Sequence, residues 1–310
     1  MMWELVGAVV GAGLASGREI AAFFARFGYA GYIGIAAAGF VLHLLGTMRY
    51  PLAFRYAWLE QLWRVMVTAL LVATGGGMLS GAGEVCALTL PMHGAYWLGV
   101  LGTLGVSWVL ALKIPGGLTY ISQVMMIVLF VLVGLSLFIE PRRGLNLDPG
   151  SIPESLLSGI KYGGFNAALQ ASVLTRSDVS EACQRRSVTR ACIVIALVLC
   201  LGNAVLLRQS VMLSEALPFL NVAAAYGSWG YWLFAVALYL AILSTLVACV
   251  KGVKGNVMAV GGIILVSFLG FSGVVEWVYP LLGGGCFALL LYAKFSKYSA
   301  KPFHSGMDVV

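Results

Sequence analysis

VGAVVGAGLASGREIAAFFARF, residues 6–27, is an apolar stretch long enough to enter a lipid bilayer. Gly11-Ala12-Gly13 interrupt it near the middle, and the charged pair Arg18-Glu19 follows a few residues later. A helix that only spans lipid keeps its backbone hydrogen-bonded and its charges outside. A glycine-split helix is tolerated where the freed backbone groups face a cavity, and such half-helix ends form binding sites in secondary transporters. The stretch therefore predicts a transporter of small solutes.

The composition restricts the class of protein. The chain has 310 residues, of which 61% are hydrophobic and 10% are charged, whereas soluble domains carry about 25% charged residues. A polytopic helical membrane protein fits these values. The net charge of +7 does not indicate a nucleic-acid partner, because the basic residues are spread over loops. The histidines and cysteines form no metal-binding or catalytic grouping, so we expect neither an enzyme nor an organic cofactor.

Runs of about 20 apolar residues predict about ten transmembrane helices in a single domain, residues 1–310. The predicted spans are 2–27, 30–50, 62–83, 93–112, 117–139, 154–176, 187–207, 228–250, 256–273 and 276–295. A polar, proline-rich loop at 140–153 divides the chain into halves of five helices, residues 1–139 and 154–295. Residues 208–227 predict a short re-entrant or interfacial helix, and residues 296–310 a short tail.

The positions of lysine and arginine predict the orientation of the spans. With a cytoplasmic N-terminus, 13 of the 19 basic residues fall on the cytoplasmic side and 4 on the outside, while Arg18 and Lys161 lie within spans. Cytoplasmic loops carry an excess of basic residues. We therefore expect both termini to be cytoplasmic.

Five helices in each half mean that the second half enters the membrane from the opposite side, which is the arrangement of an inverted repeat. Helix six should then resemble helix one in being broken. Residues 160–166, IKYGGFN, place two glycines and polar groups within the span 154–176. Paired breaks of this kind, each with a charge inside the span, indicate a binding site between helices one and six.

The stretch GAVVGAGLASGRE at 7–19, followed by FFARFG at 23–28, resembles the YkvI-type family of bacterial membrane proteins. The Tyr162-Gly-Gly-Phe-Asn166 segment is similar to that family's Tyr-x-x-Tyr-Asn pattern. The family looks like a compact member of the amino acid–polyamine–organocation superfamily. The resemblance implies an all-α protein of the bacterial inner membrane with the five-plus-five LeuT-type fold. Arg18 departs from the family's Gly-Gln-Glu pattern, so no substrate preference is carried over.

The same resemblance implies a Na⁺ site between helices one and eight. It places Gly7 and Val10 at two backbone-carbonyl positions, Ala241 at a third, and Ser244 and Thr245 at two hydroxyl positions. Neutral oxygens of this kind suit a hard cation. Alternatively, the two hydroxyl groups bond back to carbonyl groups one turn earlier in their own helix.

The residues around the two breaks have the chemistry of a zwitterion site. Free N–H groups at the start of a half-helix favour a carboxylate, and small residues let the ligand approach the backbone. An aromatic wall and an amide would face it from helix six. The predicted substrate-binding residues are Gly11, Ala12, Gly13, Ser16, Glu19, Lys161, Tyr162, Gly163, Phe165 and Asn166.

Three charged residues leave alternatives open. We expect Glu19 to face inward, as a counter-ion for a substrate amine or as a proton carrier, with Arg18 turned toward the outer interface. Glu19 could instead form a structural ion pair with Lys161 or Arg18. Lys161 could bind an anionic substrate, or its ammonium group could replace a cation.

The sequence thus predicts Na⁺-coupled symport of an amino acid or a related small amine by alternating access. One alternative is a proton-coupled or exchange carrier of the same fold, with Glu19 or Lys161 as the titrating group. Another is a ligand-sensing receptor subunit that binds the solute without translocating it. The expected partners are the solute and the lipid bilayer.

Overall fold

The computed structural model describes most of the chain. The described residues are 1–48, 50, 52, 54–113, 127, 128, 130, 131, 133–138, 150–175, 179–209, 213, 215–253 and 255–296. Most of the predicted span 117–139, the loop 140–153 and the tail 296–310 lie outside them. The described residues are organised mostly as helices joined by turns.

Helix one is broken, as the sequence predicts, and it is broken twice. The helix α1 (Met2–Val9) ends at Val10, whose backbone is not helical (φ −83°, ψ 68°). A single turn, α2 (Ala12–Ala15), follows and ends before Gly17, which has a φ of +84°. The chain then forms α3 (Arg18–Phe23) and the 3₁₀ segment η1 (Ala25–Ala30). The second break, at Gly17, was not predicted.

The remaining elements are long helices with a few short helical turns between them. In chain order they are α4 (Gly31–Gly46), α5 (Ala57–Thr89), α6 (Ala95–Lys113), η2 (Ser136–Phe138), α8 (Ile152–Leu174), α9 (Glu181–Arg208), α10 (Pro218–Ala223), η4 (Ala224–Tyr226), α11 (Gly227–Gly252), α12 (Val257–Ser267), α13 (Gly270–Gly273), η5 (Val274–Val278) and α14 (Tyr279–Phe295). The short helix expected within 208–227 is α10, which begins with Pro218 at a position that tolerates proline.

Within the described residues, six helical stretches are long and apolar enough to cross a membrane: Ala25–Gly46, Ala57–Thr89, Ala95–Lys113, Glu181–Arg208, Pro218–Gly252 and Gly270–Phe295. The predicted span 256–273 corresponds to a shorter apolar helix, Val257–Ser267. The structure thus supports an all-helical protein with several membrane spans. The count of ten stays a prediction.

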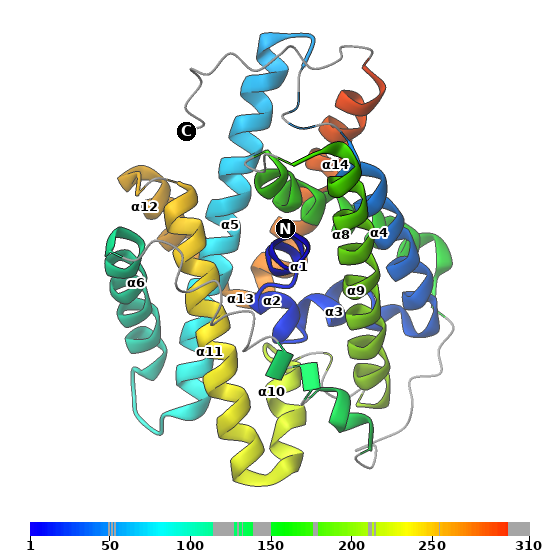
Figure 1. Cartoon of the computed structure of the whole chain (residues 1–310). Coiled ribbons are helices and arrows are strands. Elements are labelled where there is room, and N and C mark those ends of the chain that lie inside the picture. The colour runs from blue at the N-terminus through cyan, green and yellow to red at the C-terminus, as the bar shows by residue number, and fades with distance from the viewer. Residues whose placement is uncertain are drawn as a thin grey trace.

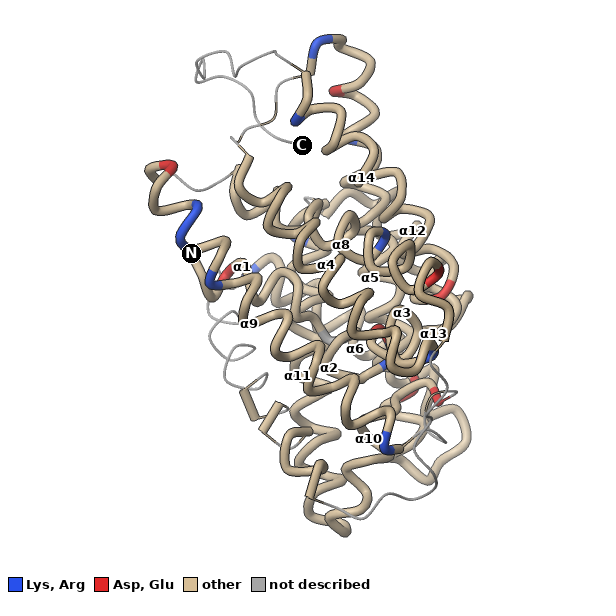
Figure 2. The backbone as a smooth tube through the Cα atoms, turned by 90° about the vertical axis from the view of Figure 1, so that its right-hand side faces the viewer, with Lys and Arg blue, Asp and Glu red and all other residues tan. Residues whose placement is uncertain are grey.

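Helix one runs from an edge of the molecule into the bundle, where Gly13 to Ala25 are all buried (Figures 1 and 2). The helix α1 packs on α8 and α9, and α2 packs on α11 and α5. On one side α4, α8 and α14 pack together, and on the other α5 packs on α6, α11 and α12. Figure 2 shows long uncharged stretches along α4, α6, α9 and α11, as expected for helices surrounded by lipid.

The predicted break in helix six is wrong. The helix α8 is continuous through Gly163-Gly164, and it begins with a hydrogen bond from Glu154 N to the Ser151 hydroxyl. The glycines serve close packing instead. A Cβ on Gly163 would lie 2.8 Å from Val41 of α4, and one on Gly164 would collide with the Gly283 carbonyl of α14. Small residues allow helix backbones to approach closely in membranes, which explains the glycines without a break.

The chain before α14 departs from regular helix in two places. Gly270 has a φ of +73°, a left-handed conformation that favours glycine. Residues Val274–Val278 then form a π-helical turn, η5, that continues directly into α14. Turns of this type often occur at functional sites.

The close contact between α8 and α4 generates a stability prediction. A Cβ on Gly159 would meet the backbone of Gly34, with only 2.8 Å to its carbonyl carbon. We expect Gly159→Ala to lower the free energy of unfolding by about 1–3 kcal/mol through overpacking, measured by thermal unfolding in detergent. Gly284→Ala in α14 is the matched control, because its Cβ would meet nothing within 4 Å. Equal stability of the two variants would contradict this packing.

Candidate functional site

The Glu19 side chain points into the bundle beside the break in helix one. Glu19 is only 4% exposed. Its carboxyl group occupies the space that a side chain on Gly13 would fill, since a Cβ there would lie 2.8 Å from the Glu19 Cδ. The chain therefore folds back so that α3 places a carboxyl group against the backbone of α2. Glycine at position 13 is required for this approach.

Aromatic side chains from two other helices surround this carboxyl group. The Tyr162 hydroxyl of α8 interacts with it, and the Tyr162 ring packs edge-on against Phe23 and Phe24, with centroids 5.2 and 5.0 Å away. Phe165, one turn along α8, stacks on Tyr279 of α14 at 4.2 Å. The predicted aromatic residues Tyr162 and Phe165 thus lie among further aromatic rings, and their contact with a solute stays a prediction.

Several polar atoms in this region are fully buried without a hydrogen-bond partner of good geometry among the described residues. They are Glu19 Oε2, Thr74 Oγ1, Tyr162 Oη, Asn166 Oδ1 and Tyr279 Oη. We call these five residues the Glu19 cluster. Buried polar atoms are nearly always hydrogen-bonded in native proteins. Such a concentration of buried polar atoms beside a broken helix marks the surroundings of Glu19 as the candidate functional site.

Three other predicted site residues do not belong to the Glu19 cluster. The Ser16 hydroxyl donates to Gly13 O (2.8 Å) and accepts from Arg18 N (3.3 Å), so it links α2 to α3. Gly163 packs on α4, away from the Glu19 cluster. Lys161 is half-buried, and its carbonyl group packs on Gly283. Of Ala12, the structure describes the backbone alone.

Arg18 connects α3 to η5 and to the segment before α10. Its guanidinium group forms an ion pair with Glu276 of η5. It also donates to the carbonyl groups of Leu213 (2.8 Å) and Glu215 (3.1 Å). Arg18 is only 6% exposed, and it pairs with Glu276 rather than with Glu19.

The structure brings the first break next to α11. A Cβ on Gly11 would lie 3.8 Å from Thr245 Oγ1. The hydroxyl groups of Ser244 and Thr245 both donate to Ala241 O, each at 2.9 Å, which is the local arrangement that the sequence left as an alternative. The hydroxyl oxygens keep lone pairs for a cation, whereas the Ala241 carbonyl group is already occupied.

The carbonyl groups of the other two predicted ligands are available. Among the described residues, no backbone N–H donates to Gly7 O or Val10 O, because α1 ends there. Such orphan carbonyl groups at a helix end require a partner. Carbonyl and hydroxyl oxygens are the donor types that a hard cation prefers, and Ala241 is the weakest of the five predicted ligands because its carbonyl group already accepts two hydrogen bonds. The Na⁺ site itself stays a prediction.

Sequence reasoning missed four contributors to this region. Tyr279 and Thr74 complete the Glu19 cluster, Glu276 binds Arg18, and Phe219 of α10 lies against Gly17, where a Cβ would come within 2.9 Å of the ring. A charge inside the predicted span 276–295 was a signal for Glu276. Thr74 was visible as a polar residue inside the predicted span 62–83, whereas Tyr279 and Phe219 meet helix one through tertiary packing alone.

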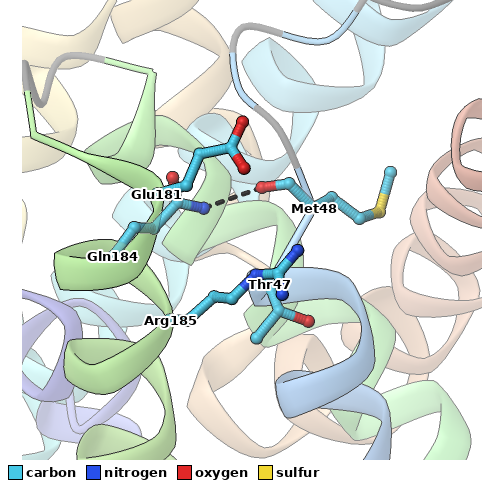
Figure 3. Close-up of a pocket in the computed structure, with 5 residues that line it drawn as sticks. All are labelled: Thr47, Met48, Glu181, Gln184 and Arg185. Atoms are coloured by element: carbon cyan, nitrogen blue, oxygen red, sulfur yellow. Dashed lines mark hydrogen bonds between the residues drawn. The ribbon is translucent and has the colours of Figure 1, made fainter.

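A separate small pocket of about 170 Å³ lies where α4 ends and α9 begins, lined by Thr47, Met48, Glu181, Gln184 and Arg185 (Figure 3). The Gln184 amide donates to Gly46 O (3.1 Å) and Met48 O (2.7 Å), which joins the two helices. None of the predicted site residues lines this pocket. In the described part of the chain, no group of three His, Cys, Asp or Glu residues is placed to hold a metal ion.

The long apolar helices define the chain as a multi-pass helical membrane protein. No protein-family model matches the chain. It is 30% identical over 188 residues to the uncharacterized membrane protein YkvI of Bacillus subtilis (strain 168). This alignment covers 54% of the chain and 54% of that protein, so the chain matches about half the length of this curated relative. The similarity supports the YkvI-type resemblance and the membrane class.

The bend at Gly17 generates a second stability prediction. Alanine there would face both a left-handed backbone (φ +84°) and the Phe219 ring. Gly255 is the matched control, because it has a φ of +63° but open space around it. We expect Gly255→Ala to cost about 1–2 kcal/mol of stability, and Gly17→Ala about 1–3 kcal/mol more through overpacking. Thermal unfolding checks this, and equal losses would show that Phe219 does not pack on Gly17.

Proposed function

We propose that the protein is a secondary active transporter for a small amine-containing organic solute such as an amino acid. The observation that carries this proposal is the double break of helix one within the bundle, with the buried carboxyl group of Glu19 folded against Gly13. Broken helices at the centre of a helical membrane protein are the feature on which transporter binding sites are built. A purely structural helix would avoid both the breaks and the buried acid.

The chemistry around the break suits an ammonium group. A carboxylate provides the counter-charge, and the faces of Tyr162, Phe165 and Tyr279 attract cations. Asn166 Oδ1 supplies a further acceptor, which is buried and unpartnered in the described structure. A solute carboxylate would meet the N–H groups released between α1 and α2. A site that accepts an ammonium group at one end and a carboxylate at the other suits an amino acid or a related solute.

Sodium coupling is the proposed energy source. The support is the proximity of Gly11 to Thr245 together with the free carbonyl groups at the end of α1. A cation bound there would join α1 to α11, so that closure of the site would depend on the ion. Loading the ion would thereby favour the solute-binding conformation by population shift.

The five-plus-five inverted repeat remains part of this proposal. The pairing of Arg18 with Glu276 and with the carbonyl groups near residue 215 supports a mechanism of alternating access. These contacts connect α3 to η5 and to the segment before α10, and they would have to separate for the solute to enter from that side. The receptor alternative shares the binding site and lacks the translocation step.

Sodium dependence is the first test. With Na⁺ exchanged for K⁺ at fixed ionic strength, we expect Na⁺ to raise the thermal stability of the purified protein, by about 2.7 kcal/mol at 100 times its Kd. The Ser244→Ala/Thr245→Ala variant should lose this rise. A Ser267→Ala/Thr89→Ala variant should keep it, since those hydroxyl groups make the same local bonds, to Ile264 O and Val85 O, elsewhere.

The outcomes separate the alternatives. Equal stability of the wild-type protein in Na⁺ and K⁺ would remove the sodium proposal. Uptake of labelled amino acids into proteoliposomes, driven by an inward Na⁺ gradient or, where Na⁺ has no effect, by an inward proton gradient, would distinguish transport from sensing. Solute-dependent stabilisation without uptake would favour the receptor.

A further inference from the structure

The Glu19 carboxyl group has no cationic partner in the described part of the chain. Its neighbour Arg18 is engaged by Glu276 and by two backbone carbonyl groups. Among the described residues, no ion pair joins Glu19 to Lys161, although Lys161 precedes Tyr162 in α8. The carboxyl group is therefore either an unpaired negative charge inside a membrane protein or a neutral acid.

The groups that face Glu19 do not supply the missing positive charge. Tyr162 of α8 and Tyr279 of α14 are the titratable side chains that interact with it, and both are neutral in their ordinary form. Neither hydroxyl group has a hydrogen-bond partner of good geometry among the described residues. An ionised carboxylate at this position would thus be poorly compensated.

The other elements packed against α3 also leave the charge uncompensated. The turn α2 has no titratable side chain, and α9 meets α3 through Gly202, next to Ile20. Arg26 of η1 is exposed and lies over the Phe27 ring, with its guanidinium carbon 4.6 Å from the ring centroid. Glu276 of η5 is itself an acid, and it is bound to Arg18.

The size of the site selects the cation. The unpartnered atoms of the Glu19 cluster are fully buried, so the described conformation leaves no room for water at them. A hydrated metal ion or an ammonium group would need a cavity there, whereas a proton needs none. A neutral carboxylic acid also costs far less to bury than an unpaired carboxylate.

From this geometry we infer that Glu19 binds a proton in the conformation described here. The bound proton converts the carboxylate to a neutral acid, and it comes from water on the side to which the site last opened. For the proposed transport function, on which this step rests, loss of the proton would leave a carboxylate free to bind the solute's ammonium group. The proton and the solute would then occupy Glu19 in turn.

Infrared difference spectroscopy of the purified full-length protein tests the inference directly. We expect a neutral-carboxyl C=O band near neutral pH that disappears as the pH is raised. The band should be absent from Glu19→Gln and retained in Glu84→Gln, which removes a half-exposed carboxyl group of α5 outside the cluster. A wild-type protein without this band near neutral pH, or a band lost in Glu84→Gln instead, would overturn the inference.

Two further measurements keep the test independent of folding and of the sodium proposal. Glu19→Asp retains the carboxyl group and should retain a band at a shifted position, and the wild-type pH series needs no variant. The Na⁺ effect on stability is read from Ser244 and Thr245, not from Glu19. A neutral-carboxyl band together with no Na⁺ effect on stability would remove the sodium proposal alone. A Na⁺ effect on stability without this band would remove the proton inference alone.

Discussion

Backbone groups released by the breaks in helix one have to be covered by the rest of the protein, because lipid offers no hydrogen bonds. The arrangement around residues 10–18 follows from this requirement. The Ser16 hydroxyl bridges Gly13 O and Arg18 N, and Phe219 N of α10 donates to Ser16 O at 3.0 Å. The short helix α10 therefore completes the hydrogen bonding of helix one as well as packing against it.

The glycine contacts of α8 give this region a firm support. Gly159 and Gly163 bring α8 close to α4, and Gly164 brings it close to α14. With its position fixed from two sides, α8 presents Tyr162, Phe165 and Asn166 toward the Glu19 cluster. A continuous α8 opposite a broken helix one also means that conformational change is easiest in helix one, where backbone hydrogen bonds are already missing.

How far the sequence predicts this architecture depends on the range of the interactions involved. The break near Gly11 and the inward Glu19 were visible locally, because a helix that only spans lipid rarely combines glycines with a charge inside its apolar run. The glycines of α8 carry the same local signal, yet they serve helix packing, and only the neighbouring helices distinguish the two uses. The partners Glu276 and Tyr279 are more than 250 residues from Arg18 and Glu19 in sequence, so residue patterns could not join them.

The π-helical turn η5 sets the angular relation between two parts of the last transmembrane stretch. It contains Glu276, which binds Arg18, and it continues into α14, where Tyr279 stacks on Phe165. Deleting one residue within Val274–Val278 would restore α-helical geometry and turn the preceding segment by about 100° relative to α14. Glu276 and Tyr279 could then no longer face their partners together. This segment should therefore be the least tolerant of length changes in natural variants, even where its individual side chains vary.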